Sequence, residues 1–517
     1  MKETVEARTP SVRLSGDGTP FRPPAAWASA ILLAAAVALV LARNRPWDCM
    51  NGFDQSKQAF VPLVMLQEGA WWFQYLPDGL PATKPPLMGW LSAGLYRVLG
   101  GWWAGAWRGP SILAFSAVLC LLLRAGRRAA GYWGAWVAAG VFALNMLTVR
   151  IATLIRTDML LALEVFAVGL LVWRRLSTGT PWRARDRWTL FAVVLAGCFT
   201  KGPVIYAFTL PSLLAWRWLA RRRGERDHAW PGWWPWMAPF LLLGAWAAAG
   251  GVLNEAFFHR VVLREFGNNF ASIRLDEAGP VARPKLDFSH ALSYALQLIH
   301  RLLPWSLALV AWFAADRAGR RRLLADPASR WLAVWVGVSL GLMMLVPNKR
   351  ADRIFPIVPP IALLAAAAVR CASWDRWPAR PGRRLLYGLA ASAAILWGGY
   401  TIAFLRGAPR GELAAEAARY EFFRAVRAWS EREGCVVKAA GPGSDGAQST
   451  LVYLRTTRWI AEADIDAERR RGAAVVATAL MMRGRPGPVL LRQSDGGHAL
   501  LGPLPPERPD AGRPAAD

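Results

Sequence analysis

Lysine is the rare cation of this sequence, and its few copies occur where a reaction could use them. Seven of the 62 basic residues are lysines, at positions 2, 57, 84, 201, 285, 349 and 438. In a chain that otherwise uses arginine, a retained lysine suggests a site that needs a compact point charge. Lys84 lies in Lys-Pro-Pro-Leu and Lys201 in Lys-Gly-Pro, both tight settings. Chance retention in loops that need any cation is the alternative explanation.

Two aspartates occur next to apolar segments. Asp54 follows the first such segment, and Asp158 opens the fourth, two residues after Arg156. Charged groups at membrane depth are usually paired or functional. An aspartate can accept the proton of an attacking hydroxyl, while lysine and arginine can neutralise a phosphate leaving group. Together these residues suit group transfer from a phosphorylated lipid, although each aspartate could instead cap a helix.

The elements that must position these residues are membrane helices. The chain has 517 residues, 54% of them hydrophobic, and apolar stretches of roughly 16–22 residues match the ~30 Å hydrocarbon core of a bilayer. Arginine clusters alternate between the stretches, which by the positive-inside rule places the N-terminus in the cytoplasm and the site residues on the outer face. We expect 11–13 membrane helices, with segments at about 24–43, 109–123, 131–147, 159–173, 188–199, 203–219, 232–252, 304–315, 331–346, 355–369 and 385–405.

The remaining parts of the chain differ in composition. Residues 1–23 are predicted to be a cytoplasmic tail, 24–405 the transmembrane domain with outer loops 44–108 and 253–303, and 506–517 a disordered tail. Two short amphipathic pieces, 56–70 and 86–99, lie in the first loop. In 406–505 an amphipathic helix (411–433), a helical patch near 448–456 and strand-like runs between Gly/Pro turns predict a small extracytoplasmic α/β domain.

Charge and cysteine usage exclude some functions. The net charge of +27 would suit nucleic acid, but the arginines lie in short clusters between apolar segments, so no nucleic-acid partner is predicted. The cysteines and histidines lack metal-ligand spacing, and no metal or other cofactor is predicted; a divalent metal has no support in the sequence. Cys49 and Cys435 both fall in outer regions, where a disulfide between them is one option. The first apolar segment is predicted to be an uncleaved anchor.

The order of the motifs resembles a known family. Along the chain follow Asp54 with a basic residue, Lys84-Pro-Pro-Leu, Arg156-x-Asp158, Lys201-Gly-Pro, and Lys349-Arg350-x-x-Arg353-x-x-Pro356. This order is similar to that of the GT-C membrane glycosyltransferases, in the branch of the lipid A aminoarabinose transferases and the protein O-mannosyltransferases (dolichyl-phosphate-mannose-protein mannosyltransferases). Each motif alone is weak, but the set spans Trp47 to Ala367, and the outer α/β region is also similar to the aminoarabinose transferase branch.

The resemblance implies roles for individual residues. It implies that Asp54 and Asp158 are the catalytic acidic positions. Further site candidates are Arg156 and, in Leu263-Arg264-Glu265-Phe266, Glu265. The basic residues implied to bind the donor phosphate are Lys57, Lys84, Lys201, Lys349 and Arg350.

Three positions depart from the family pattern. The family usually has Asp-Glu where this chain has Asp54-Gln55, and often has Glu where this chain has Thr83. The loss of two carboxylates weakens any divalent-metal proposal and bears on which sugar or acceptor is used. Lys57 replaces an arginine, which exchanges a bidentate fork for a point charge.

The resemblance and the residues together predict an inverting glycosyltransferase. It would move a sugar from a polyprenyl-phosphate donor to a glycan, lipid A or protein acceptor at the periplasmic face of a bacterial inner membrane, among membrane lipid. A transporter or flippase of a lipid-linked sugar is the alternative from a different functional class, and transporters often show internal repeats, none of which is evident here. The motifs are also compatible with a protein O-glycosyltransferase and with a family member that has lost catalysis.

Overall fold

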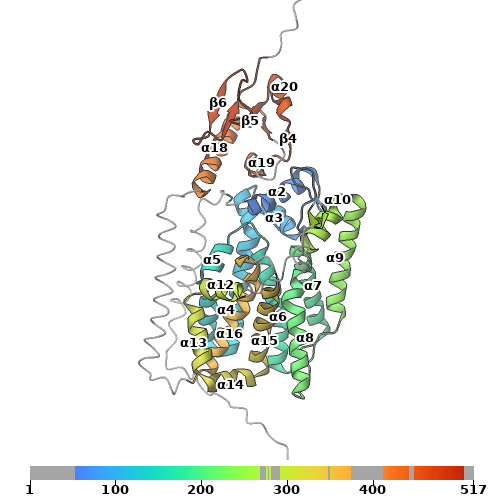
Figure 1. Cartoon of the computed structure of the whole chain (residues 1–517), viewed down its shortest axis with the longest axis vertical. Helices are drawn as coiled ribbons and strands as arrows, with labels where there is room; N and C mark the ends of the chain where they lie inside the picture. The colour runs from blue at the N-terminus through green and yellow to red at the C-terminus, as the bar shows by residue number, and fades with distance from the viewer. Residues whose placement is uncertain are drawn as a thin grey trace, which may run out of the picture.

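A computed structural model describes residues 50, 53–267, 275–276, 279–280, 292–346, 350–373, 412–441 and 448–505. These residues form a helical bundle with a small α/β domain at one end (Figure 1). The predicted segments 24–43 and 385–405, the tails 1–23 and 506–517, and Cys49 lie outside the described residues, so the predictions about them are not tested.

The bundle is the membrane part of the protein. Four helical stretches are long and apolar enough to cross a membrane: Trp103–Ala143, Trp234–Leu253, Pro327–Leu345 and Ala351–Cys371. The pair Ser293–Arg301 and Trp305–Ala315, bent by 112°, would make a fifth span if it is counted as one. The predicted fold class is confirmed: the chain is a helical, multi-pass membrane protein with a small C-terminal α/β domain.

The helices follow the predicted apolar segments closely. The described bundle contains α4 (Trp103–Ala143), α5 (Met146–Ile151), α6 (Asp158–Thr178), α7 (Ala184–Lys201), α8 (Val204–Arg222), α9 (Trp234–Leu253), α13 (Trp305–Ala315), α14 (Arg317–Ala325), α15 (Pro327–Leu345), and the 3-10 turn η3 (Ala351–Ile357) that leads into α16 (Val358–Cys371).

Helix α4 contains the predicted segment 109–123 and, after a break, the predicted segment 131–147 as far as Ala143. Gly131 adopts φ 66°, a left-handed conformation that glycine reaches without strain. Around the break the two halves touch, since a Cβ added to Gly126 would lie 2.5 Å from the carbonyl oxygen of Gly134. The two predicted segments therefore exist as two helical halves that turn at a glycine.

Helices α6 and α15 pack closely because a glycine faces two tryptophans. A Cβ on Gly169 would fall 1.9 Å from the ring of Trp335. The indole of Trp331 donates to the carbonyl oxygen of Gly169 at 3.1 Å. Both tryptophans are fully buried, so this contact fixes α6, which begins with Asp158, against the bundle.

The two predicted outer loops contain short helices and strands. In 44–108 the amphipathic pieces are helices α2 (Phe53–Glu68) and α3 (Leu87–Val98). Loop 253–303 contains α10 (Glu255–Phe257), the π-helix η1 (Phe258–Gly267), the pair β1 (Leu275–Asp276) and β2 (Gly279–Pro280), and α12 (Ser293–Arg301). The sequence did not predict these later helices because they are short and strongly amphipathic, with apolar residues such as Tyr294 and Leu298 buried.

The C-terminal domain is a five-stranded sheet with helices. Its strand order is β4-β3-β5-β7-β6, parallel from β4 to β5 and antiparallel from β5 to β6. The elements are α18 (Glu412–Glu433), β3 (Val437–Ala440), α19 (Gln448–Leu454), β4 (Trp459–Ile460), η5 (Glu462–Asp464), α20 (Ile465–Arg470), β5 (Ala474–Thr478), β6 (Val489–Arg492) and β7 (His498–Leu501). Within the described part of this domain, the sequence did not predict β4, η5 and α20, all of which are short.

This domain shares a hydrophobic core with α2. Phe60 and Leu63 of α2 are buried in the same cluster as Phe423 and Tyr453 of the domain. The backbone N–H of Met50, just before α2, donates to the Tyr453 hydroxyl at 2.9 Å. Figure 1 shows α19 directly over α2. The C-terminal domain therefore fixes the position of the helix whose first turn contains the predicted catalytic aspartate.

Candidate active site

Asp54 lies in the first turn of α2, at the end of the bundle that faces the C-terminal domain. Its side chain is 49% exposed and takes part in two ion pairs. Arg350, just before η3, donates from Nη2 to Asp54 Oδ2 at 2.8 Å, and Arg156 Nη2 lies 3.7 Å from the same oxygen. A carboxylate with this exposure and two cationic neighbours can contact a substrate without losing its charge.

The surroundings of Asp54 keep it ionised. Burial opposes ionisation, but the hydrogen bond from Arg350 and the charge of Arg156 outweigh burial and hold the pKa of Asp54 below its ordinary value. Lys84 adds a further favourable charge. The same hydrogen bond raises the pKa of the Arg350 guanidinium. Asp54 is therefore a carboxylate at neutral pH.

Arg156 connects the acidic residues of the site. Its Nε lies 2.9 Å from Asp158 Oδ2, and its Nη2 contacts Asp352. Burial of Arg156 opposes its charge, but Asp158, Asp352 and Asp54 outweigh that effect and raise its pKa. Arg156 is thus a guanidinium shared among three aspartates.

The backbone on either side of Arg156 is held by polar side chains. Arg108 of α4 donates to the carbonyl oxygen of Thr153 at 2.5 Å, and Ser111 of α4 donates to that of Leu154 at 2.6 Å. From α2, the carbonyl oxygen of the buried Gln55 side chain accepts from the N–H of Ile155 at 3.1 Å. The loop therefore has no freedom to withdraw Arg156 from the site without breaking buried hydrogen bonds.

Asp158 and Lys201 form a buried pair between α6 and α7. Lys201 Nζ lies 2.5 Å from Asp158 Oδ1, and the Asp158 side chain is only 2% exposed. Helix α7 ends at Lys201 because Gly202 adopts φ 68°, followed by Pro203 at the start of α8. With Arg156 on one oxygen and Lys201 on the other, Asp158 holds two cations in place.

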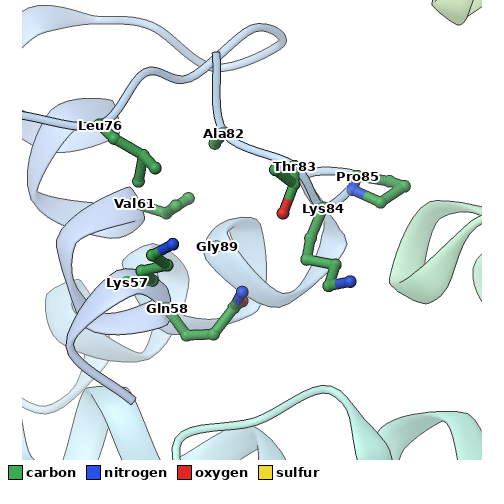
Figure 2. A pocket seen from close by; sticks show the side chains of 9 residues that line it. All are labelled: Lys57, Gln58, Val61, Leu76, Ala82, Thr83, Lys84, Pro85 and Gly89. Atoms are coloured by element: carbon green, nitrogen blue, oxygen red, sulfur yellow. The ribbon is translucent and has the colours of Figure 1, made fainter. Parts of the chain in front are cut away.

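A small cavity of about 20 Å³, partly open to solvent, lies beside this ion-pair network. Figure 2 shows the lining residues Lys57 and Gln58 on α2, and Thr83 and Lys84 on the chain before α3. Asp54, Lys57 and Gln58 are spaced i, i+3 and i+4, so they share one face of α2. Two of the four lysines in the predicted donor-phosphate set, Lys57 and Lys84, therefore line one cavity, one helical turn from Asp54.

The predicted residues fall into three groups. One continuous ion-pair network contains Asp54, Arg156, Asp158, Lys201 and Arg350. Beside this network, Lys57 and Lys84 line the cavity. Lys349 lies outside the described residues, and so does the side chain of Glu265, whose backbone belongs to η1.

Glu164, a polar residue within an apolar segment, accepts a 2.6 Å hydrogen bond from Thr200 of α7, the neighbouring helix.

Sequence reasoning missed two members of the site. Asp352 contacts Arg156 and accepts from Arg350 Nη2 at 3.2 Å. In the sequence, Asp352 is a single carboxylate inside a motif that is defined by its basic residues, so it did not stand out. Gln55 departs from the family pattern, yet its side chain forms a link between α2 and the loop before Arg156. Among the described residues no three His, Cys, Asp or Glu side chains are placed to hold a metal ion.

The comparisons with known proteins concern the fold. No protein-family model and no curated protein sequence matches the chain. ArnT from Cupriavidus metallidurans bound to undecaprenyl phosphate is similar in structure, with 17% identity, a TM-score of 0.65, and coverage of 93% of this chain and 98% of that chain. Its apo state has a TM-score of 0.59 at 17% identity, with 92% and 98% covered.

A second kind of structure is also similar. The oligosaccharyltransferase of Archaeoglobus fulgidus in its apo form shows 13% identity and a TM-score of 0.51, and the match covers 89% of this chain and 70% of that one. ArnT, a lipid A aminoarabinose transferase, and this oligosaccharyltransferase are both GT-C glycosyltransferases. The chain therefore has the GT-C fold of membrane glycosyltransferases, as its ordered motifs predicted.

Proposed function

We propose that this protein is an inverting glycosyltransferase. It moves a sugar from a polyprenyl-phosphate donor to a lipid A-type or other acceptor at the periplasmic face of a bacterial inner membrane. The observation that carries the proposal is the pairing of an exposed carboxylate, Asp54, with a cavity lined by Lys57 and Lys84 at one end of a membrane bundle. Undecaprenyl phosphate bound to the similar ArnT supports a polyprenyl-phosphate donor.

The reaction would proceed by direct displacement at the sugar. An acceptor oxygen attacks the anomeric carbon, and the bond from that carbon to the phosphate oxygen of the donor breaks. The bonding electrons leave with polyprenyl phosphate, whose added negative charge Lys84 and Lys57 stabilise. Attack opposite the leaving group inverts the anomeric configuration.

Asp54 would act on the acceptor. Because its pKa is held low by Arg350 and Arg156, it is ionised at neutral pH but is a weak base. It can orient an acceptor hydroxyl by accepting its hydrogen bond and can take the proton as the carbon–oxygen bond forms. If the acceptor is a lipid phosphate, which is already ionised, no proton needs to move and Asp54 orients the reactants only.

The other charged residues would hold this arrangement. Asp158 is buried between Arg156 and Lys201, so we assign it the role of fixing those cations rather than of touching substrate. Arg350 fixes Asp54 and contributes positive charge for the phosphate. Lys349 stays in the proposed set as a residue that binds the donor phosphate, and Glu265 stays as a further site candidate, both on the resemblance alone.

The proposed orientation follows from the arginines. Helix α6 carries Arg174 and Arg175 near its C-terminal end, and α14 contains a further arginine cluster. Figure 1 places α14 at the end of the bundle opposite the C-terminal domain. The positive-inside rule assigns that end to the cytoplasm, which puts Asp54 and the domain of residues 406–505 in the periplasm.

Product formation separates this function from a flippase that uses the same basic site only for binding. The full-length protein, purified in lipid nanodiscs, would receive undecaprenyl phosphate linked to a radiolabelled hexose together with a bacterial lipid extract. A transferase forms a labelled product and releases undecaprenyl phosphate in equal amounts. Intact donor after prolonged incubation, combined with donor movement across the bilayer of proteoliposomes, would favour the flippase.

A further inference from the structure

Glu164 is a buried carboxyl group inside the helical bundle that the proposed reaction does not use. It lies on α6 and is only 5% exposed. Among the described residues its hydrogen-bond partner is Thr200 of α7, whose Oγ1 lies 2.6 Å from Glu164 Oε1. The other oxygen, Oε2, is buried and has no hydrogen-bond partner in the described part of the chain. One half of the carboxyl group is therefore removed from water without a replacement for the lost hydrogen bonds.

The cations at the outer end of α6 and α7 are engaged elsewhere. Lys201 Nζ lies 2.5 Å from Asp158 Oδ1, and Arg156 pairs with the other oxygen of Asp158. Cys198 of α7, a titratable neighbour of Glu164, carries no positive charge. An ionised carboxylate that is buried at membrane depth without a cation is costly, and such a group keeps its proton instead. The surroundings of Glu164 therefore favour the neutral acid.

The hydroxyl of Thr200 gives a second reason. Its Oγ1 lies 2.6 Å from Glu164 Oε1 and 3.0 Å from the carbonyl oxygen of Ala196, but a hydroxyl has only one hydrogen. With an ionised Glu164, Thr200 is the donor in both contacts and must share that hydrogen. A protonated carboxyl is itself a donor. With a proton on Glu164, the carboxyl donates to Thr200 and the hydroxyl donates to Ala196, so each contact has its own hydrogen.

We propose that Glu164 is a neutral carboxylic acid that positions Lys201. Thr200 and Lys201 are the last two residues of α7. Glu164 holds the first and Asp158 holds the second, so α6 fixes the end of α7 at two consecutive residues. An ionised Glu164 would compete with Asp158 for the Lys201 ammonium, whereas a neutral acid orders the helix end and leaves the ammonium with Asp158. The consequence for donor binding rests on the proposed function.

Infrared difference spectroscopy tests the protonation state in the full-length protein in nanodiscs at neutral pH. The C=O stretch of a protonated carboxyl is separate from the stretches of a carboxylate. We expect such a band in the wild-type spectrum and its loss in Glu164→Gln. Glu255→Gln, at an exposed position on α10, is the matched control and should keep the band. Identical spectra of wild type and Glu164→Gln in this region overturn the inference.

Binding of radiolabelled undecaprenyl phosphate to the same nanodiscs tests the positioning role. Glu164→Gln keeps a neutral hydrogen-bond donor and should bind as tightly as wild type. Glu164→Leu and Thr200→Val remove the contact, and each should weaken binding about tenfold. Thr209→Val is the matched control for the threonine, because Thr209 of α8 is also buried and donates only to the carbonyl oxygen of Ile205, at 2.8 Å, among the described residues. It should bind normally.

A double-mutant cycle with Lys201→Met separates positioning from a general loss of structure. In the Lys201→Met background, Glu164→Leu should weaken binding no further, because the cation that it positions is gone. An undiminished loss in that background overturns the positioning role, and so does wild-type binding by Glu164→Leu or weakened binding by Glu164→Gln. Transfer from undecaprenyl-phosphate glucose is measured in parallel. Its absence in wild type contradicts the proposed function instead, while the infrared band and the binding cycle still decide the role of Glu164.

Discussion

Arg350 donates to Asp54 over 2.8 Å although the two residues are 296 positions apart. The contact joins the first turn of α2 to the segment before η3, and Arg156 joins the same cluster from the loop before α6. Three segments from distant parts of the chain thus meet at one carboxylate. Because these segments meet in space, residues that are far apart in the sequence form a single site.

Removing the Arg350 side chain should impair the reaction more than it impairs folding. In Arg350→Ala, Asp54 keeps the guanidinium of Arg156 but loses that of Arg350. The region proposed to bind the donor phosphate also loses one positive charge. We expect kcat/KM for transfer to fall about 100-fold or more, a loss of about 2.7 kcal/mol in transition-state stabilisation, with normal expression. Arg432→Ala, at a 72% exposed position on α18, is the matched control. Equal activity of the two variants would remove Arg350 from the site.

Gln55 should affect the rate through the loop that holds Arg156. Gln55→Ala leaves the N–H of Ile155 without its buried acceptor, a cost of about 1–3 kcal/mol. We expect a lower Tm and a kcat reduced about tenfold, with KM for the donor little changed. Gln55→Glu keeps an acceptor oxygen and should retain more activity than alanine. Indistinguishable kcat values for the two variants would contradict this positioning role.

Tyr453 should report on the contact between the C-terminal domain and α2. Its hydroxyl accepts from the N–H of Met50 at 2.9 Å and donates to Glu416 at 2.6 Å. Tyr453→Phe leaves the N–H of Met50 without its acceptor and removes one of the hydrogen bonds to Glu416, which keeps Arg419. We therefore expect about 1–3 kcal/mol of destabilisation, measured as a lower Tm, and reduced transfer. Tyr96→Phe is the control, because the Tyr96 hydroxyl makes no hydrogen bond within the described part of the chain. Wild-type transfer by Tyr453→Phe would mean that the domain contact does not position α2.

Protonation of Asp54 should not lower kcat/KM as the pH falls through the neutral range. Its pKa lies below the ordinary value of 3.8. The stability contributed by its ion pairs is therefore fully present above about pH 5 and is lost only as the pH falls through the lowered pKa. We expect kcat/KM for a pre-ionised phosphate acceptor to be flat from about pH 5 to pH 8. An acid limb centred near pH 6.5 that Asp54→Glu shifts would contradict this assignment.

The sequence predicted the parts of the site that have a local signature. Lys84 and Lys201 stand out because lysine is rare here and each lies beside proline or glycine. The helix ends that position Asp158 and Lys201 followed from the apolar segments and from Gly202-Pro203, since chain turns depend on local residues. In the C-terminal domain, alternation and turns likewise predicted the longer elements, whereas the short β4, η5 and α20 were missed.

The rest depends on contacts between distant segments, which one sequence does not encode in its spacing. Asp352 belongs to the site only because η3 brings it to Arg156, 196 residues away. The core shared by α2 and the C-terminal domain joins apolar side chains from segments that are far apart in the sequence. The amphipathic α12 was assigned to a loop because its nine residues are too few for a membrane segment.

The most direct test of the central claim compares two aspartate variants in one transfer assay. Purified wild-type protein, Asp54→Asn, and Asp464→Asn at an exposed position on η5 would receive radiolabelled undecaprenyl-phosphate glucose with a bacterial lipid extract. We predict labelled product and released undecaprenyl phosphate from wild type and Asp464→Asn, and at least a roughly 1,000-fold lower rate from Asp54→Asn with unchanged donor binding. Transfer by Asp54→Asn at the wild-type rate would contradict the account.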